Sequence, residues 1–315
     1  MQIKLILQDP VAKMLSLVLP AGLMRKKRYF SLWENRGYHV TPVHFYEPIP
    51  DTRSLKNELW EKRSELIGID INEKKQLELL SSFVSKFRME YGYLPQEKTS
   101  IPYEYYINNG SFSSVDGEIL YCMIRHFKPK AIFEIGSGNS TYLSAQAVLK
   151  NREEAEETKC ELVAVDPYPK APLKVGFPGL STLKTIRTED IPLSEFAKLG
   201  ENDILFIDSS HVLKIGSDVQ YLYLEVLPRL NKGVIIHLHD IFLPAEYPRR
   251  WILKDHFFWN EQYLLQAFLC FNESFEVLWA GSYMHLLHPD KLEMAFNSYK
   301  REERWPGSFW IKKVK

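Results

Sequence analysis

The chain has 315 residues, 45% of them hydrophobic, which suits a folded globular protein of one large domain or two smaller ones. Forty basic residues balance forty acidic ones, so the composition gives no reason to expect a nucleic acid or another anionic polymer as partner. No apolar run approaches the roughly 20 residues that cross a bilayer, and we expect no transmembrane segment.

The first 110 residues show no alternation of strands and helices, and we expect them to form a mainly helical cap. An apolar segment at 11–24, interrupted by Pro20 and Gly22, precedes a basic run at 25–28. A secretory signal would have its charge first. We interpret the segment as an amphipathic helix packed on the body of the protein, with an interfacial membrane anchor as the alternative.

Two further helices are predicted before residue 110, at 52–64 and 72–91. The second is the clearer one, because apolar residues recur at helical spacing between charged ones. A polar and aromatic segment at 103–116 could close over a ligand, and it leads into a helix at 115–127.

From Lys130 onward, apolar runs and helical segments alternate, which predicts a mostly parallel, doubly wound α/β sheet with helices on both faces. The predicted strands lie at 131–135, 161–165, 182–186, 203–207 and 233–238. Helices are predicted at 215–230 and 260–271, and the segments 275–279 and 308–311 can form a closing antiparallel pair. We therefore expect a second domain at 111–315.

Three cysteines, Cys122, Cys160 and Cys270, are widely spaced and match no metal-binding pattern. They suit a reducing compartment, where we expect them as buried thiols. The sequence therefore predicts a cytoplasmic protein.

The predicted strand at 131–135 ends in a glycine turn. Gly136 and Gly138 can adopt positive φ and leave bare backbone for a ligand. A dinucleotide fingerprint would have a third glycine where Thr141 stands. The next strand ends at Asp166, about 30 residues on, where a ribose-binding acid belongs. The two strand ends predict a site for a nucleoside-like ligand.

Acids and histidines follow the fourth and fifth predicted strands. Asp208 and His211 come after the fourth, and His239 and Asp240 end the fifth. Ligands in open α/β sheets bind at the carboxyl ends of the strands, and sequential strands commonly neighbour each other, so these side chains should converge. His237 shares a strand face with His239 but lies deeper, and we interpret it as structural.

Five segments occur in a characteristic order, with a late hairpin after them. They are Glu134-Ile-Gly-Ser-Gly138, Val165-Asp166, Thr188-Glu189-Asp190, Phe206-Ile-Asp-Ser-Ser-His211 and His237-Leu-His-Asp240. This order resembles the class I S-adenosylmethionine-dependent methyltransferases, most of all the bacterial branch called methyltransferase family 24, over residues 100–313. The resemblance implies a Rossmann-like, seven-stranded sheet with an antiparallel last strand, and S-adenosylmethionine as cofactor.

The resemblance also implies which residues bind the methionine part of the cofactor. Gly136 and Gly138 would line it, with Ser137 between them as a further cofactor-binding residue. Glu134 would lie near the amino group.

The nucleoside part and the reacting methyl group are assigned in the same way. Asp166 would bind the ribose hydroxyls, since a carboxylate can accept both hydrogen bonds. Glu189 or Asp190 would lie near the adenine. Asp208 would lie closest to the methyl group.

The implied reaction is an in-line displacement at a sulfonium methyl, for which the protein must align the nucleophile and remove its proton. Similar metal-dependent O-methyltransferases carry an Asp-x-x-base segment after the fourth strand and an acidic pair after the fifth. Asp208 and His211 fit the first, with His211 as general base, since an ordinary pKa of about 6.5 suits that role. Asp240 fits the second, but His239 stands where an acid is expected. We hypothesise that Asp208, His239 and Asp240 bind a divalent metal ion.

Aromatic residues follow the fifth strand, where acceptor pockets lie. They are Trp251, Phe257, Phe258, Trp259 and Tyr263. Aromatic faces favour sugars or planar rings, and core packing under a lid explains them equally well. We expect O-methylation of a small hydroxylated metabolite or a glycan, with no nucleic-acid partner, by a chain that could form a homo-oligomer.

Three other functions stay open. One is a nicotinamide-dependent oxidoreductase, and another is a catalytically silent scaffold that keeps the cofactor pocket. The third is a non-haem iron oxygenase that uses His237 or His239 with Asp240.

Overall fold

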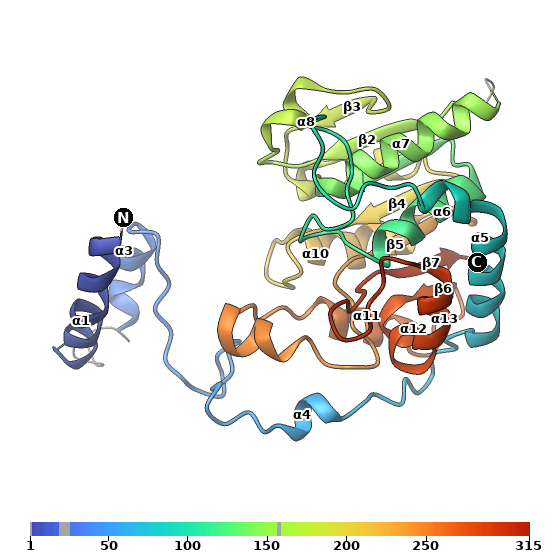
Figure 1. Ribbon diagram of the computed structural model, residues 1–315. Coiled ribbons are helices and arrows are strands. Elements are labelled where there is room, and N and C mark those ends of the chain that lie inside the picture. Colours follow the sequence, from blue (N-terminus) through green and yellow to red (C-terminus); the bar gives the residue numbers. More distant parts are fainter. Residues whose placement is uncertain (1, 19–25, 156–158) are drawn as a thin grey trace. The chain divides into compact units, whose positions relative to one another are not determined.

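The computed structural model describes residues 2–18, 26–155 and 159–315 (Figure 1). The chain divides into two compact units, residues 1–57 and residues 58–315. Residues 19–25, which hold part of the expected amphipathic helix and the start of the basic run, lie outside the described residues.

The smaller unit is helical. It contains α1 (Gln2–Val18), the 3₁₀ turn η1 (Lys27–Tyr29) and α3 (Phe30–Glu34). The observed helix α1 begins nine residues before the apolar segment from which a helix was expected. Across the part of the chain that the structure describes, no helix is both long and apolar enough to cross a membrane.

The larger unit is built on a seven-stranded sheet in the order β3-β2-β1-β4-β5-β7-β6. Its strands are β1 (Ala131–Ile135), β2 (Glu161–Val165), β3 (Thr182–Lys184), β4 (Ile204–Ile207), β5 (Ile235–Leu238), β6 (Phe275–Ala280) and β7 (Phe309–Lys313). Strands β1 to β5 pair in parallel, and β7 pairs antiparallel with both β5 and β6. The predicted doubly wound sheet and its antiparallel closure are confirmed.

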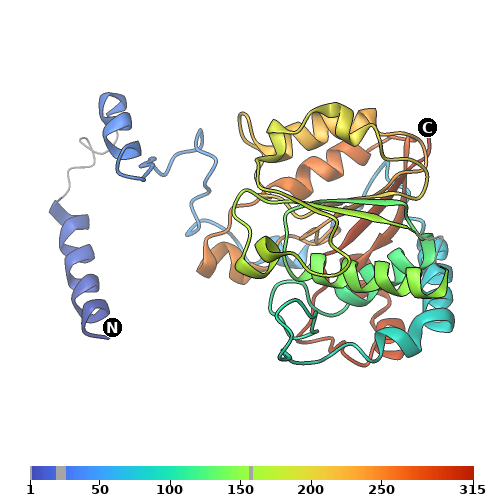
Figure 2. The same cartoon turned by 90° about the horizontal axis from the view of Figure 1, so that it is seen from above.

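Helices cover both faces of the sheet (Figure 2). The helices of the larger unit are α4 (Glu58–Glu61), which buries no residue, α5 (Glu73–Tyr91), α6 (Asp116–Phe127), α7 (Asn139–Glu154), α8 (Ala171–Val175), α9 (Leu193–Phe196), α10 (Asp218–Tyr221), α11 (Glu261–Leu269), α12 (Gly281–Leu287) and α13 (Pro289–Ala295). One apolar core lies between the sheet and α5, α6, α7 and α13, and a second lies on the face of α10 and α11. A parallel sheet covered in this way needs strands that are apolar on both faces, which is why they read as continuous hydrophobic runs.

The side chains of β1 point alternately to the two faces of the sheet. Ile132 belongs to the core under α7, whereas Phe133 and Ile135 belong to the opposite core. Since successive side chains of a strand point to opposite faces, Glu134 shares the α7 side with Ile132.

The predicted helix at 215–230 is divided into three pieces. After α10, a π-helical turn spans Leu222–Val226 and a 3₁₀ turn spans Leu227–Arg229. Pro228 explains the change, because proline lacks the amide hydrogen and its ring clashes with the carbonyl four residues before it. The predicted helix at 52–64 is likewise reduced to α4.

Residues 58–110 belong to the larger compact unit, whereas the sequence analysis expected a cap that extends to residue 110. Helix α5 explains the difference. Its buried Gln76 accepts a hydrogen bond from the Ala280 amide at the end of β6 (2.8 Å), and its apolar residues join the core of α6.

All three cysteines are free thiols. Cys122 is buried as expected, while Cys160 and Cys270 are only partly buried.

Candidate active site

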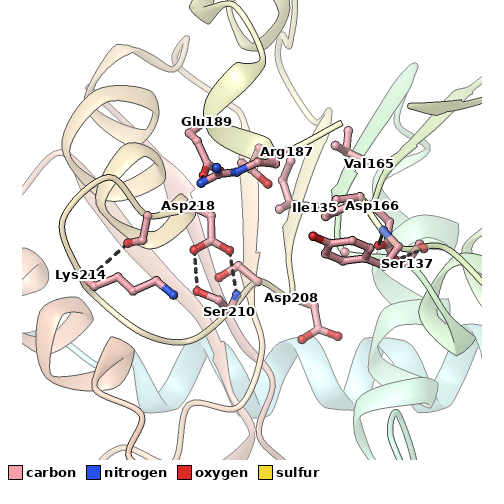
Figure 3. Close-up of a pocket in the computed structure, with 16 residues that line it drawn as sticks. Ile135, Ser137, Val165, Asp166, Arg187, Glu189, Asp208, Ser210, Lys214 and Asp218 are labelled. Atoms are coloured by element: carbon pink, nitrogen blue, oxygen red, sulfur yellow. Dashed lines mark hydrogen bonds and ion pairs between the residues drawn. The ribbon is translucent and has the colours of Figure 1, made fainter. Parts of the chain in front are cut away.

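The carboxyl ends of β1, β2 and β4 and the turn after β3 surround a cavity of about 530 Å³ (Figure 3). Open α/β sheets bind their ligands at this edge. Five of the residues that the sequence analysis assigned to the cofactor line the cavity. They are Gly136, Ser137, Asp166, Glu189 and Asp208.

The two glycines of the turn have different surroundings. Gly136 has a φ of +86°, and a Cβ on it would lie 2.1 Å from the carbonyl oxygen of Asp208. A Cβ on Gly138 would meet no atom within 4 Å. Gly136 therefore permits the close approach of β1 and β4, while Gly138 leaves free space. Thr141, at the place of the missing third glycine, accepts a hydrogen bond from the Gly138 amide (2.9 Å).

Asp166 is held against the glycine turn at the end of β2. Its Oδ2 accepts a hydrogen bond from the Ser137 hydroxyl (2.6 Å), and its Oδ1 accepts one from the Tyr168 amide (2.7 Å). Figure 3 shows Ser137 and Asp166 together on one side of the cavity. The carboxylate is thus oriented before any ligand binds.

Glu134 does not line the cavity. It is fully buried, and its Oε1 accepts hydrogen bonds from Ser140 (2.6 Å) and Thr141 (3.0 Å) in the first turn of α7. Its Oε2 is buried and has no hydrogen-bond partner among the described residues. Burial raises the pKa of Glu134 to about 8, against the opposing effect of the two hydroxyls. Its proposed place near an amino group stays a prediction.

The turn after β3 distinguishes Glu189 from Asp190, the two acids that the sequence left as alternatives near the adenine. Glu189 lines the cavity and pairs with Arg187, whereas Asp190 is exposed and does not line it. The geometry therefore favours Glu189.

A second group of side chains lies beside the cavity at the ends of β4 and β5. His211 is buried, and its Nδ1 lies 2.9 Å from Glu261 Oε2. Its Nε2 lies 3.3 Å from Asp208 Oδ1 and 3.6 Å from Asp240 Oδ2. The predicted convergence of Asp208, His211 and Asp240 is present in the structure, with one further carboxylate.

The backbone fixes the position of His211. Its φ is +59°, a left-handed conformation that is uncommon for a residue other than glycine. Its carbonyl oxygen accepts hydrogen bonds from the amides of Asn260 (3.1 Å) and Glu261 (3.2 Å) at the start of α11. The same helix start that binds the carbonyl also places the Glu261 carboxylate on the imidazole.

These contacts shift the pKa values of His211 and Asp208. Burial lowers the pKa of His211, but the hydrogen bonds to Asp208 and Glu261 outweigh it, so the pKa lies well above its ordinary value. Burial raises the pKa of Asp208, but the charge of His239 and the hydrogen bond with His211 lower it to about 2. At neutral pH the His211 ring of the free protein is therefore protonated, while burial raises the pKa of the neighbouring Asp240.

The two histidines of β5 differ. His237 is fully buried, its Nε2 lies 3.0 Å from the Ser308 hydroxyl, and its ring stacks on Phe206 with 3.9 Å between ring centroids. These contacts suit a structural role, which stays a prediction. His239 Nε2 lies 3.6 Å from Asp240 Oδ1, and the carboxylates of Asp240 and Asp208 raise the pKa of His239 against the effect of burial.

The hypothesised metal ligands are arranged differently from expectation. Among the described residues, the donor atoms of Asp208, His211 and Asp240 lie within 4.8 Å of one another, and His239 does not belong to this group. The Glu261 carboxylate orients the imidazole of His211, as carboxylates do for metal-binding histidines. Two carboxylates and one imidazole suit Zn²⁺, Mn²⁺ or Fe²⁺. The residues present therefore fit a divalent ion, with His211 in the place assigned to His239.

Aromatic rings extend from His211 toward the surface. The ring of Trp259 lies 4.3 Å from the ring of His211, and Phe257 stacks on Trp259 at 5.1 Å with an angle of 6°. Trp251 packs edge-on against Trp259 at 5.1 Å. Phe257 remains 41% exposed, so the aromatic wall begins at the buried group and reaches solvent.

Sequence reasoning missed Glu261, which lies 50 residues after His211. The only local signal was an acid in the first turn of a predicted helix, which usually serves the helix itself. Nothing in the sequence connected it to a histidine on another element.

A family model described as a methyltransferase domain matches residues 133–241, from within β1 to just past β5. An uncharacterized protein from Archaeoglobus fulgidus is 32% identical over 178 residues, which are 53% of this chain and 77% of that protein.

Two solved structures are similar at low identity. A plantazolicin methyltransferase in complex with a triazolic desmethyl analogue and SAH is 15% identical, with a TM-score of 0.40, over 78% of this chain and 100% of that one. An O-methyltransferase from Bacillus cereus in complex with SAH is 13% identical, with a TM-score of 0.27, over 77% of this chain and 91% of that one. At these scores they assign no role to any residue here.

Proposed function

Because this chain belongs to the class I S-adenosylmethionine-dependent methyltransferases, we propose that it methylates a hydroxyl oxygen of a small metabolite or a sugar. The observation that carries the proposal is the adjacency of the cavity and the histidine group. Asp208 belongs to both, since it lines the cavity and lies 3.3 Å from His211. A donor in the cavity and an acceptor beside His211 would meet at this residue.

The cavity walls support a definite orientation of the donor. Asp166 is positioned to accept hydrogen bonds from the ribose hydroxyls, and Glu189 lies on the adenine side. The free space at Gly138 suits the methionine part. Asp208 then faces the methyl group, where its carboxylate holds the sulfonium in line with the acceptor.

His211 is the proposed general base, and its contacts decide when it can accept a proton. An imidazolium cannot accept the proton of a hydroxyl. His211 becomes a base only when positive charge at the site competes for Asp208, because Asp208 and Glu261 hold its proton in the free protein. Glu261 would then keep the ring oriented through Nδ1.

Asp208 and Asp240 would hold a divalent ion, with His211 Nε2 as the third donor. Such an ion polarises an acceptor hydroxyl and lowers its pKa. The two proposals for His211 exclude each other, since one Nε2 lone pair serves either the metal or the proton. Dialysis against a chelator separates them: lost turnover that Mn²⁺ or Zn²⁺ restores supports the ligand role, and unchanged turnover supports the base.

The acceptor side supports a ring-shaped substrate. Trp259 and Phe257 present flat faces next to His211, and such faces favour sugars or planar rings. The hydroxyl to be methylated would point from the aromatic wall toward Asp208.

Two measurements test the proposed function. Calorimetry should show heat with S-adenosylhomocysteine and none with NAD, and the opposite result would favour an oxidoreductase. A panel of hydroxylated sugars and planar-ring compounds is then assayed with the native protein, His211→Ala and the control His256→Ala, whose exposed histidine lies outside the site. Loss in His211→Ala alone supports its role, equal rates in all three remove it, and no rate in any favours a cofactor-binding scaffold.

A further inference from the structure

One face of helix α1 carries an apolar stripe. Val11, Met14, Leu15 and Val18 follow one another at helical spacing, so their side chains share one face. These four side chains are 49%, 57%, 44% and 65% exposed. Over residues 11–18, this apolar face of α1 is therefore exposed.

Two of the neighbouring positions of the same helix are polar, whereas Leu17 is apolar and 87% exposed. Lys13 and Ser16 are exposed, and the Ser16 hydroxyl donates a hydrogen bond back to the Lys13 carbonyl (2.7 Å). A stripe of this kind next to a polar face is the pattern of a helix that lies at an interface between an apolar and an aqueous phase.

Charge is distributed unevenly along the chain. Residues 1–36 hold seven basic and two acidic residues, a net charge of +5, in a chain whose total net charge is zero. Lys26, Lys27 and Arg28 are exposed, and within the described ranges none of the three forms an ion pair with a carboxylate. Such asymmetry indicates an anionic partner.

Exposed apolar side chains also follow the basic residues. Phe30 is 48% exposed and Leu32 is 53% exposed. A nucleic acid would pair with the basic residues but would leave the stripe and these two side chains in water. A lipid surface satisfies both the charge and the apolar area.

We propose that the smaller unit binds the surface of an anionic lipid bilayer, with the stripe of α1 inserted at the level of the headgroups and Lys26, Lys27 and Arg28 paired with lipid phosphates. Each basic residue near such a surface adds to the binding, and burial of the apolar stripe adds the rest. The proposal stands apart from methyl transfer, because no residue of the cavity takes part in it.

The first test is co-sedimentation of the full chain with vesicles of phosphatidylcholine and phosphatidylglycerol, beside vesicles of phosphatidylcholine alone. We expect binding to the anionic vesicles and about tenfold weaker binding for Met14→Glu. Ser16→Glu makes the same charge change on the polar face, and its binding should fall by about twofold at most.

The second test separates charge from apolar insertion. Lys26→Glu combined with Lys27→Glu should weaken binding to anionic vesicles by about tenfold or more. The control reverses two exposed lysines of the larger unit, Lys86→Glu with Lys232→Glu, and should bind like the native protein. Raising the salt concentration should reduce native binding, since charge pairing at a surface is screened.

Three results would overturn the proposal. The first is no binding of the native chain to anionic vesicles, or equal losses for Met14→Glu and Ser16→Glu. The second is a lower melting temperature or a smaller oligomer for Met14→Glu, because the stripe would then pack on the larger unit or on a second copy. The third is oligonucleotide binding that is as strong as vesicle binding and unaffected by Met14→Glu.

Discussion

One edge of the sheet has two halves that both carry acids. The first half is formed by the carboxyl ends of β1 and β2, and the second by the carboxyl ends of β4 and β5. In the first half, Glu134 and Asp166 accept hydrogen bonds from serine, threonine and amide groups. In the second, Asp208 and Asp240 lie within 3.6 Å of an imidazole nitrogen. Burial raises the pKa of Glu134 to about 8 against its two neutral hydroxyl partners, whereas the charge of His239 and the hydrogen bond with His211 outweigh burial and lower the pKa of Asp208 to about 2.

Asp208→Asn should have the largest effect, because Asp208 is the carboxylate shared by the cavity and His211. We expect kcat to fall about 1,000-fold, roughly 4 kcal/mol in activation free energy, because the donor loses its alignment and His211 loses a charged partner. Steady-state kinetics with the acceptor found in the panel measures it. Asp190→Asn removes an exposed acid outside the cavity and should leave kcat unchanged. Equal effects of the two changes on kcat would contradict the proposal that Asp208 serves both the cavity and His211.

Gly136→Ala and Gly138→Ala should separate the two functions of the glycine turn. A methyl at Gly136 would meet the Asp208 carbonyl at a positive φ, so the free energy of unfolding should fall by about 3 kcal/mol. A methyl at Gly138 meets open space, so denaturation should change little while affinity for S-adenosylhomocysteine falls. Equal stability losses would mean that the space at Gly138 is not available to a ligand.

The pH dependence of stability should distinguish Glu134 from the acids at the ends of β4 and β5. Between pH 5 and 7, folded Glu134 keeps its proton, since its pKa is raised to about 8, whereas the unfolded chain releases it. The folded state binds more protons there, so stability falls as pH rises. Through Glu134, the free energy of unfolding should fall by about 2.5 kcal/mol over these two pH units. Glu134→Gln should remove this contribution in denaturant titrations of the ligand-free protein and leave that of Glu118, whose pKa burial raises to about 7. A slope that Glu134→Gln does not change would contradict the raised pKa of Glu134.

Asp166→Asn should have the smallest effect of the series. The amide keeps the shape and one acceptor, so affinity for S-adenosylhomocysteine should fall about tenfold through the loss of a charged hydrogen bond. Calorimetry measures it, with Asp190→Asn as the matched control. An unchanged affinity would remove Asp166 from the cofactor site.

Much of the fold was predictable because its signals are local. Four parallel strands follow from buried apolar runs, whereas the edge strand β3 has no buried residue. The turn at Gly136 follows from the close approach that glycine allows. Helix 215–230 was predicted as continuous because periodicity is insensitive to a proline near its end, and Pro228 divides it.

The sequence by itself determined the order of the strands along the chain, the acids at their ends and the convergence of Asp208, His211 and Asp240. Tertiary structure alone decided that Glu189 rather than Asp190 lines the cavity, that His211 rather than His239 completes the group of possible metal ligands, and that Glu261 joins it. Strand pattern is set by neighbours along the chain, whereas the charge of a buried histidine depends on groups that folding brings within a few ångströms.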